Sequence, residues 1–149
     1  MGITILNQQD LLKVPHSTLR RVARCVLEKF GEERSQLSIV LVSDETIATY
    51  NERYLSHQGP TDVISFPQRD GDIPSPRQEL LGDVMVSVER AKAQAEEYGH
   101  GVEEELVLLV IHGILHLLGW DDQSPEDRAE MEAQQLRLLK ECYPQPTGS

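Results

Sequence analysis

The feature that most constrains this chain is an apolar segment, long enough for a helix, that carries two histidines. Val102 to Leu118 is predicted to form one helix, and its first turn holds Glu103 to Glu105, where acids suit the positive end of the helix dipole. From Leu106 onward the segment is apolar on every side, so other elements must surround it. It is too short to span a bilayer, which takes about 20 apolar residues. We therefore expect a globular protein built around this helix, with no membrane association.

Strand and helix signals follow one another along the rest of the chain without regular alternation. Runs of β-branched and apolar residues predict strands, and apolar residues at helical spacing predict helices. The expected strands are Ile3 to Leu6, Leu37 to Val42, Val63 to Phe66 and Asp83 to Val88. The other expected helices are Leu19 to Phe30, a helix capped by Ser43, a helix from Ser87 to Gly99, and a last one capped by Ser124 and reaching about Cys142. This order predicts an α+β fold in which helices cover one small sheet.

The length and composition are those of one domain. The chain has 149 residues, of which 39% are hydrophobic and 26% charged, so it can bury one sizeable core. We expect a single domain over residues 1–143, followed by a disordered tail over 144–149. The first residues lack the pattern of a signal peptide, which favours a cytoplasmic protein. In that compartment Cys25 and Cys142 are expected to be reduced, and neither is given a catalytic role.

The charge is strongly negative and unevenly distributed. A formal net charge of −11 argues against a protein that holds nucleic acid mainly by bulk positive charge, and no DNA binding is expected. A local basic patch remains compatible with this value. Residues 11–27 contain Lys13, Arg20, Arg21 and Arg24 and no acid. Each of these arginines has a simpler interpretation as part of a solvated helix face.

The two histidines of the central helix, His112 and His116, are four residues apart and therefore share one helix face. An isolated pair of this kind is more often a pair of core residues than a metal site. Here, however, the surrounding leucine, isoleucine and valine residues offer the imidazoles no polar partner. Gly119 can end the helix in a left-handed conformation and turn the chain back, which brings Asp122 towards the same point. The sequence therefore predicts a metal site formed by His112, His116 and Asp122.

Two imidazoles and one carboxylate suit a single zinc ion, although iron and manganese use the same ligands. Three protein ligands leave one position for water, whose pKa zinc lowers towards neutrality, so hydrolysis is the expected use. We expect this metal-bound water to be the catalytic group and assign no catalytic side chain. The spacing is similar to that of metzincin proteases, but their glutamate base follows the first histidine. Gly113 stands at that position, which argues against a protease.

Three sequence blocks together resemble one protein family. The segment His112-Gly-Ile-Leu-His-Leu-Leu-Gly-Trp-Asp121 fits the signature His-Gly-x-Leu-His-Leu-x-Gly-aromatic-Asp-His up to its last residue. Thr61 to Pro67 and Leu81 to Val84 fit two other recurrent blocks, and the match extends nearly from end to end. On these residues the chain resembles the bacterial YbeY proteins, metal-dependent endoribonucleases of ribosomal RNA maturation.

The resemblance implies a mixed four-stranded sheet packed with helices and a zinc ion in a cleft. It also implies cleavage of single-stranded RNA, processing of the 3′ end of small-subunit ribosomal RNA, and ribosome quality control on the small subunit. If RNA is the substrate, the arginines at 20, 21 and 24 predict the surface along which it approaches. Two other functions stay open: a zinc metalloprotease-like amide hydrolase, and a non-catalytic ribosome-associated protein whose metal only stabilises the fold.

Two residues depart from the family pattern. Asp122 stands where the family usually has a third histidine, and Leu55 stands where it usually has an arginine that serves phosphate binding or catalysis. Arg53 or His57 could replace that arginine, but both are equally well explained as solvated residues near a helix end, and neither is assigned a catalytic role. Structural roles are favoured at three other places. We expect Thr61-Asp62 to cap the turn into a strand and Gly82-Asp83 to form a turn before the next strand. Trp120 is expected to pack beside the metal loop.

Overall fold

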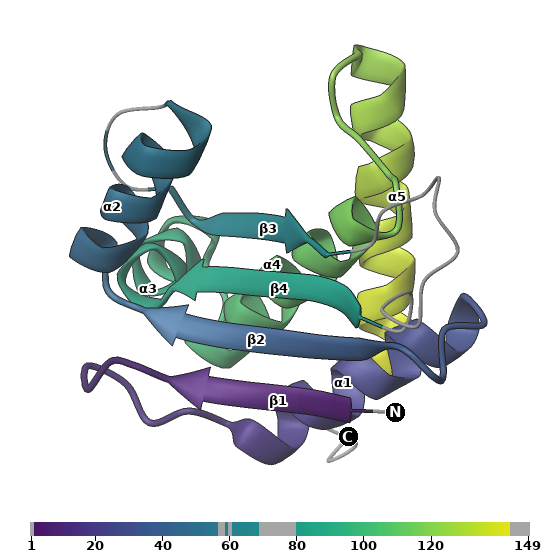
Figure 1. Cartoon of the computed structure of the whole chain (residues 1–149), viewed down its shortest axis with the longest axis horizontal. Coiled ribbons are helices and arrows are strands. Elements are labelled where there is room, and N and C mark those ends of the chain that lie inside the picture. Colours follow the sequence, from purple (N-terminus) through teal and green to yellow (C-terminus); the bar gives the residue numbers. More distant parts are fainter. Residues whose placement is uncertain (1, 57–58, 60, 69–79, 144–149) are drawn as a thin grey trace.

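The structure is a computed structural model, which describes residues 2–56, 59, 61–68 and 80–143. Within these residues, four strands and five helices follow one another in an irregular order, and Figure 1 shows how they are arranged. The strands are β1 (Gly2–Asn7), β2 (Gln36–Val42), β3 (Val63–Pro67) and β4 (Leu80–Ser87). The helices are α1 (His16–Lys29), α2 (Asp44–Leu55), α3 (Val88–Tyr98), α4 (Val102–Leu117) and α5 (Pro125–Cys142). The predicted elements are confirmed, with ends that differ by a few residues. The predicted tail, residues 144–149, lies outside the described part.

The sheet is mixed, with the strand order β1-β2-β4-β3. β1, β2 and β4 are parallel to one another, whereas β3 pairs with β4 in the antiparallel direction. β1 and β3 therefore form the two edges. This confirms the α+β class and the mixed four-stranded sheet that the resemblance implied.

The two faces of the sheet bury different sets of side chains, because successive residues of a strand point to opposite sides. Leu37, Ile39 and Leu41 of β2 belong to the main core, which also contains the buried faces of α1, α4 and α5. Val40 and Val42, on the opposite face, pack in a smaller cluster with Ile47 of α2. Figure 1 shows α3 and α4 behind the sheet and α2 beside its left-hand end.

The helix α4 is the centre of the main core, as its composition predicted. It contacts α1, α3 and α5 together with β3 and β4, and nine of its residues are buried. No helix in the described ranges is both long enough and apolar enough to cross a membrane.

The caps explain where the neighbouring helices begin and end. Ser43, Ser87 and Ser124 each accept a hydrogen bond from a backbone N–H in the first turn of α2, α3 and α5. Gly99, with φ of 73°, closes α3 in the left-handed conformation that glycine adopts without strain. These sequence signals mark the first turns of α2, α3 and α5 and the end of α3.

One expectation about the cysteines is wrong. Cys25 of α1 and Cys142 at the end of α5 form a disulfide instead of two free thiols. The reason is that α1 and α5 pack side by side against α4, which brings the two Cα atoms to 5.6 Å although the cysteines are 117 positions apart in sequence. Nothing in the local sequence around either cysteine indicates this contact.

Candidate metal centre

The two histidines lie on the face of α4 that points towards β3 and α5. Their Nε2 atoms are 3.0 Å apart, one helical turn from each other. Both side chains are partly exposed, although the helix around them is buried. Both rings therefore reach the surface of the molecule with the same nitrogen directed at the same point.

Gly113, next to His112, is required by the packing of α4 on the sheet. A Cβ atom at this position would lie 2.5 Å from Cγ1 of Val84 in β4 and 3.3 Å from the Ser65 hydroxyl in β3. The Ser65 hydroxyl also donates a hydrogen bond of 2.8 Å to the Gly113 carbonyl. A glutamate here would require Val84 to shift, so the structure gives a steric reason for the absence of the metalloprotease base.

Asp122 returns to the histidines because of the turn after α4. Gly119 has φ of 102°, and the Trp120 N–H donates to the Leu115 carbonyl over 3.0 Å, which ends the helix and reverses the chain. This turn places Oδ2 of Asp122 3.9 Å from Nε2 of His116. The predicted role of Gly119 as a left-handed helix end is thus confirmed.

The three predicted ligands lie together. One donor atom from each of His112, His116 and Asp122 lies within 4.8 Å of the other two. Donors at about 2.0–2.2 Å from a tetrahedral zinc ion lie roughly 3.3 Å from one another. The distances of 3.0 and 3.9 Å on either side of His116 bracket that value, and all three donors lie within 4.8 Å, so these residues fit a zinc ion once the side chains adjust.

Asp121, the neighbour of Asp122, has a different environment. Its Oδ1 accepts a hydrogen bond of 3.3 Å from the Gln123 backbone N–H, which holds the carboxylate against its own loop. The group that can hold a metal includes Asp122 and not Asp121. The loop geometry therefore agrees with the prediction of Asp122 as the third ligand.

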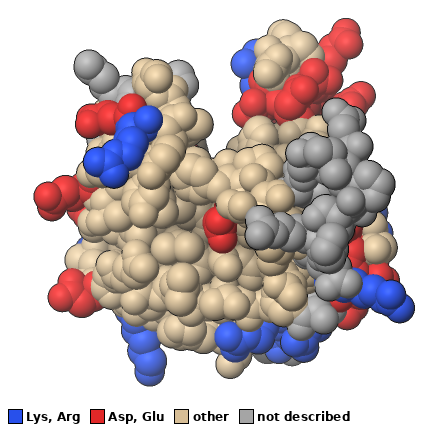
Figure 2. All heavy atoms as spheres, in the orientation of Figure 1, with Lys and Arg blue, Asp and Glu red and all other residues tan. Residues whose placement is uncertain are grey.

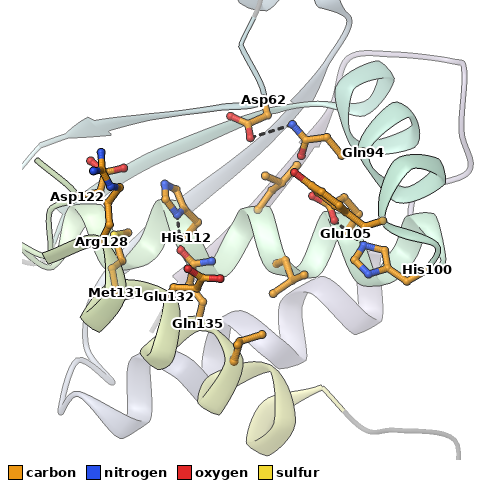
Figure 3. A pocket seen from close by; sticks show the side chains of 14 residues that line it. Asp62, Gln94, His100, Glu105, His112, Asp122, Arg128, Met131, Glu132 and Gln135 are labelled. Atoms are coloured by element: carbon orange, nitrogen blue, oxygen red, sulfur yellow. Dashed lines mark hydrogen bonds and ion pairs between the residues drawn. The ribbon is translucent and has the colours of Figure 1, made fainter. Parts of the chain in front are cut away.

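The imidazole of His112 has a second partner on the side away from the metal position. Nδ1 of His112 is hydrogen-bonded to Oε1 of Gln135 in α5, and Figure 3 shows Gln135 reaching His112 from the neighbouring helix. The Trp120 backbone lies close enough to the His116 ring to raise the pKa of that ring. Such outer partners orient metal-binding histidines in known sites.

The electrostatics favour neutral, metal-binding imidazole. Burial lowers the pKa of His116, and the neighbouring His112 lowers that pKa further. The carboxylate of Asp122 and the Trp120 backbone oppose these effects and raise the pKa of His116. Because the net shift is downward from 6.5, the ring of His116 is mainly unprotonated at neutral pH and has a lone pair to offer.

Two hollows meet at the three candidate ligands. The first is a groove of about 440 Å³ lined by β3 and the residues before it, together with Leu55 at the end of α2. Figure 2 shows the corresponding notch between the α2 side and the α5 side of the molecule. The second, of about 380 Å³, lies between α3, α4 and α5 and is drawn in Figure 3. Asp62, His112 and Asp122 line both hollows, so the candidate site is open from two directions.

The structure clarifies the roles of the other sequence blocks. Asp62 accepts a hydrogen bond of 2.8 Å from the Val63 N–H, the capping role that we expected, and its other oxygen accepts one of 3.2 Å from Gln94. Trp120 packs against the main core, also as expected. Gly82 has a positive φ of 153° within β4, and a Cβ there would lie 2.5 Å from the Phe66 carbonyl oxygen. Close strand packing, not a turn, therefore explains this glycine, which corrects the expectation for Gly82-Asp83.

Leu55, at the position of the usual family arginine, lines the groove and is 43% exposed. Arg53 lies in the last turn of α2 but is not among the residues that line either hollow. His57 lies outside the described residues. The arginine's position therefore faces the candidate site, although this chain has a leucine there.

Sequence reasoning missed Gln135 and Gln94, which line the second hollow. A signal for Gln135 was present, because α5 buries Met131, Leu138 and Cys142 along one stripe and Gln135 lies on the same stripe. A polar residue within an apolar stripe indicates a buried polar partner. No comparable pattern surrounds Gln94.

Two imidazoles and a carboxylate in an open groove are the donor set of one-metal hydrolases. The comparisons with known proteins make this class specific. The family described as Endoribonuclease YbeY matches residues 4–143. The chain is 42% identical to the endoribonuclease YbeY of Nocardia farcinica, over 96% of this chain and 81% of that protein. It is 41% identical to the one from Symbiobacterium thermophilum, over 93% and 96%. The chain belongs to the endoribonuclease YbeY family.

The fold has been seen before in a solved structure. A Thermotoga maritima protein solved in solution superimposes with a TM-score of 0.64, at 24% identity and with 99% of each chain covered. At this level of identity the likeness concerns the fold alone.

Proposed function

We propose that this protein is a single-strand-specific, metal-dependent endoribonuclease that acts in the cytoplasm. Its substrate would be the 3′ end of small-subunit ribosomal RNA, reached on the small ribosomal subunit during maturation and quality control. The observation that carries the proposal is the convergence of His112, His116 and Asp122 where two hollows meet. Membership of the endoribonuclease YbeY family supplies the substrate class.

The three residues would hold one zinc ion, which when bound supplies a Lewis acid for a phosphoryl oxygen and lowers the pKa of water. The chain's own contribution is to fix the donors and to leave access to them. The side chain of Asp122 is 46% exposed and that of His116 is 29% exposed, so a backbone phosphate can approach from the groove. This access favours catalysis over a purely structural metal, whose site is normally closed.

The groove also favours a single strand over a duplex. It is bounded by Leu55 on one side and by the loop of Asp122 on the other, and its volume of about 440 Å³ suits a few nucleotides of one strand. An A-form duplex holds its backbone in a fixed curve, whereas an unpaired strand can bend to follow the groove. The substrate is therefore expected to be an unpaired segment.

The direct test is to incubate zinc-loaded protein with unstructured RNA, with the same RNA annealed to its complement, and with casein. We expect cuts in the unstructured RNA only, and none with His116→Ala. Digestion of casein with intact RNA would contradict the proposal and support the amide hydrolase. Metal binding without cleavage of any of the three would support the structural metal. Mapping of 3′ ends on immature small subunits then tests the ribosomal substrate.

A further inference from the structure

We infer that Gln135 is a positioning residue that holds His112 in the tautomer whose Nε2 lone pair faces the metal position. This inference rests on the proposed metal-dependent function. A neutral imidazole carries its proton on one ring nitrogen and offers a lone pair on the other. Only the Nδ1–H tautomer of His112 can donate on one side and bind a metal through Nε2 on the other.

The contacts of His112 determine which tautomer is favoured. Nδ1 faces Oε1 of Gln135, an oxygen that can only accept, so Nδ1 must carry the proton. Nε2 faces the other way, 3.0 Å from Nε2 of His116. Because Nδ1 carries the proton, Nε2 of His112 has the lone pair. In the absence of metal, this lone pair accepts a hydrogen bond from the His116 ring. The hydrogen bond to Gln135 thus prepares the lone pair at the position where the candidate ligands converge.

The position of Gln135 on α5 makes this arrangement rigid. Gln135 lies one turn from Met131 and nearly one turn from Leu138, both of which are buried against the core. Packing on both sides of Gln135 holds its backbone in place, and α5 is further tied to α1 by the disulfide at Cys142. The amide is thus held by the core instead of by a mobile surface loop. A ligand that is oriented in advance loses less entropy on binding than one that must first be ordered.

Three variants of α5 test the inference. Gln135→Leu keeps a similar volume and removes the acceptor. Gln135→Glu keeps an acceptor oxygen in place. Gln134→Leu is the matched control, because Gln134 is the next residue, is also partly buried, and bonds only to Arg137 among the described residues.

Zinc affinity is measured by competition with a chromogenic chelator, without RNA. We expect Gln135→Leu to lose about 10–100-fold in zinc affinity, the usual cost of removing an outer partner of a metal ligand. Gln135→Glu should keep or increase the affinity, and Gln134→Leu should leave it unchanged. Equal zinc affinity in Gln135→Leu and the wild type would overturn the inference.

The tautomer is read directly from the ¹⁵N shifts of His112 in the metal-free wild-type protein, a measurement that needs no variant to fold. We expect Nδ1 protonated and Nε2 unprotonated, with a mixture of tautomers in Gln135→Leu. An unprotonated Nδ1 in the wild type would overturn the inference, since the amide would then be donating to the ring. If Nδ1 is unprotonated and the wild type still cleaves RNA, the inference fails and the proposed function stands. If the tautomer and the zinc affinities are as expected but RNA is not cleaved, the proposed function fails and the inference stands.

Discussion

At the scale of single residues, the choice between two adjacent aspartates decides the composition of the candidate metal site. We expect Asp122→Ala to lose zinc affinity as severely as His116→Ala, because each removes one of three donors. Asp121→Ala should bind zinc like the wild type, since its carboxylate is bonded to its own loop. Metal analysis of the purified variants measures this. Loss of metal in Asp121→Ala with retention in Asp122→Ala would show that the loop turns differently.

The chemical identity of the third donor should also set the pH dependence. A carboxylate carries a charge that an imidazole lacks, so it makes the ion a weaker Lewis acid and leaves its water with a higher pKa. Asp122→His should therefore keep the metal and move the pH–rate profile for RNA cleavage to lower pH. A profile that stays in place would mean that a group other than the metal-activated water controls the rate.

The leucine in the groove predicts a gain of function. Leu55 lines the groove with the candidate ligands, so an arginine there can reach a phosphate bound at the site. We expect Leu55→Arg to raise kcat/KM for RNA cleavage about tenfold, through added stabilisation of the charged transition state. Leu11→Arg is the control, because Leu11 is similarly exposed, at 51%, and the change in net charge is the same. Equal gains in the two variants would indicate bulk charge instead of position.

Residues whose neighbours lie close in sequence were the predictable part of the site. His112, His116 and Asp122 fall within one helix and the turn after it, so helical geometry and the Gly119 turn were enough to bring them together. Gln135 comes from another helix, and its contact with His112 depends on how α5 packs on α4. The sequence contains no local rule that fixes this packing.

At the scale of elements, Tyr143 connects the end of α5 to the start of α4. Its hydroxyl donates a hydrogen bond of 2.7 Å to Oε2 of Glu103. Burial, followed by this bond, raises the pKa of Tyr143 to about 12. The folded protein therefore keeps the proton at a pH where the unfolded chain, with a tyrosine pKa near 10, has lost it.

This raised pKa predicts how stability changes in alkaline solution. The contribution of Tyr143 is fully present below about pH 10 and is lost as the pH rises towards 12, because only the folded state still binds the proton in that window. The free energy of unfolding of Tyr143→Phe should consequently fall less steeply than that of the wild type between these pH values. Urea denaturation across the window measures both slopes, and equal slopes would contradict the assigned bond.

The elements themselves were predictable because each carries its own start and stop signals. Ser87 and Gly99 bound α3, and Ser124 with Pro125 opens α5, all within a few residues of one another. The order and direction of the strands were a different matter. Local signals do not say that β4 inserts between β2 and β3, since this depends on which long connections the helices allow.

At the scale of the whole molecule, the basic patch and the candidate site lie towards opposite edges of the sheet. Arg21 and Arg24 are exposed on α1, which packs near β1, whereas the groove lies along β3. Figure 1 shows α1 and β3 on opposite sides of the sheet. An RNA strand that contacts both must be longer than one that only fills the groove.

This separation refines the prediction for the arginines. Changing Arg20, Arg21 and Arg24 together to glutamine should weaken the binding of long single-stranded RNA and reduce the slope of log affinity against log salt by roughly 2, for three lost phosphate contacts. A short oligonucleotide that fills only the groove should bind the variant and the wild type equally. Fluorescence anisotropy at several salt concentrations measures both. Unchanged binding of the long RNA would mean that the patch is only a solvated face.

The disulfide has a mechanical consequence. It closes a loop whose two ends are 117 positions apart, and this loop contains both hollows and all three candidate ligands. Tension applied to the two ends of the chain therefore passes through the sulfur atoms and bypasses the loop. Fully extended, the bypassed segment would measure roughly 400 Å, at about 3.4 Å per residue. When the two ends are pulled in an optical trap, the unfolded oxidised protein should be shorter than the unfolded reduced protein by that length. The Cys25→Ser variant should reach the full length without reductant. Under oxidising conditions the candidate metal centre is thus shielded from stretching forces on either terminus.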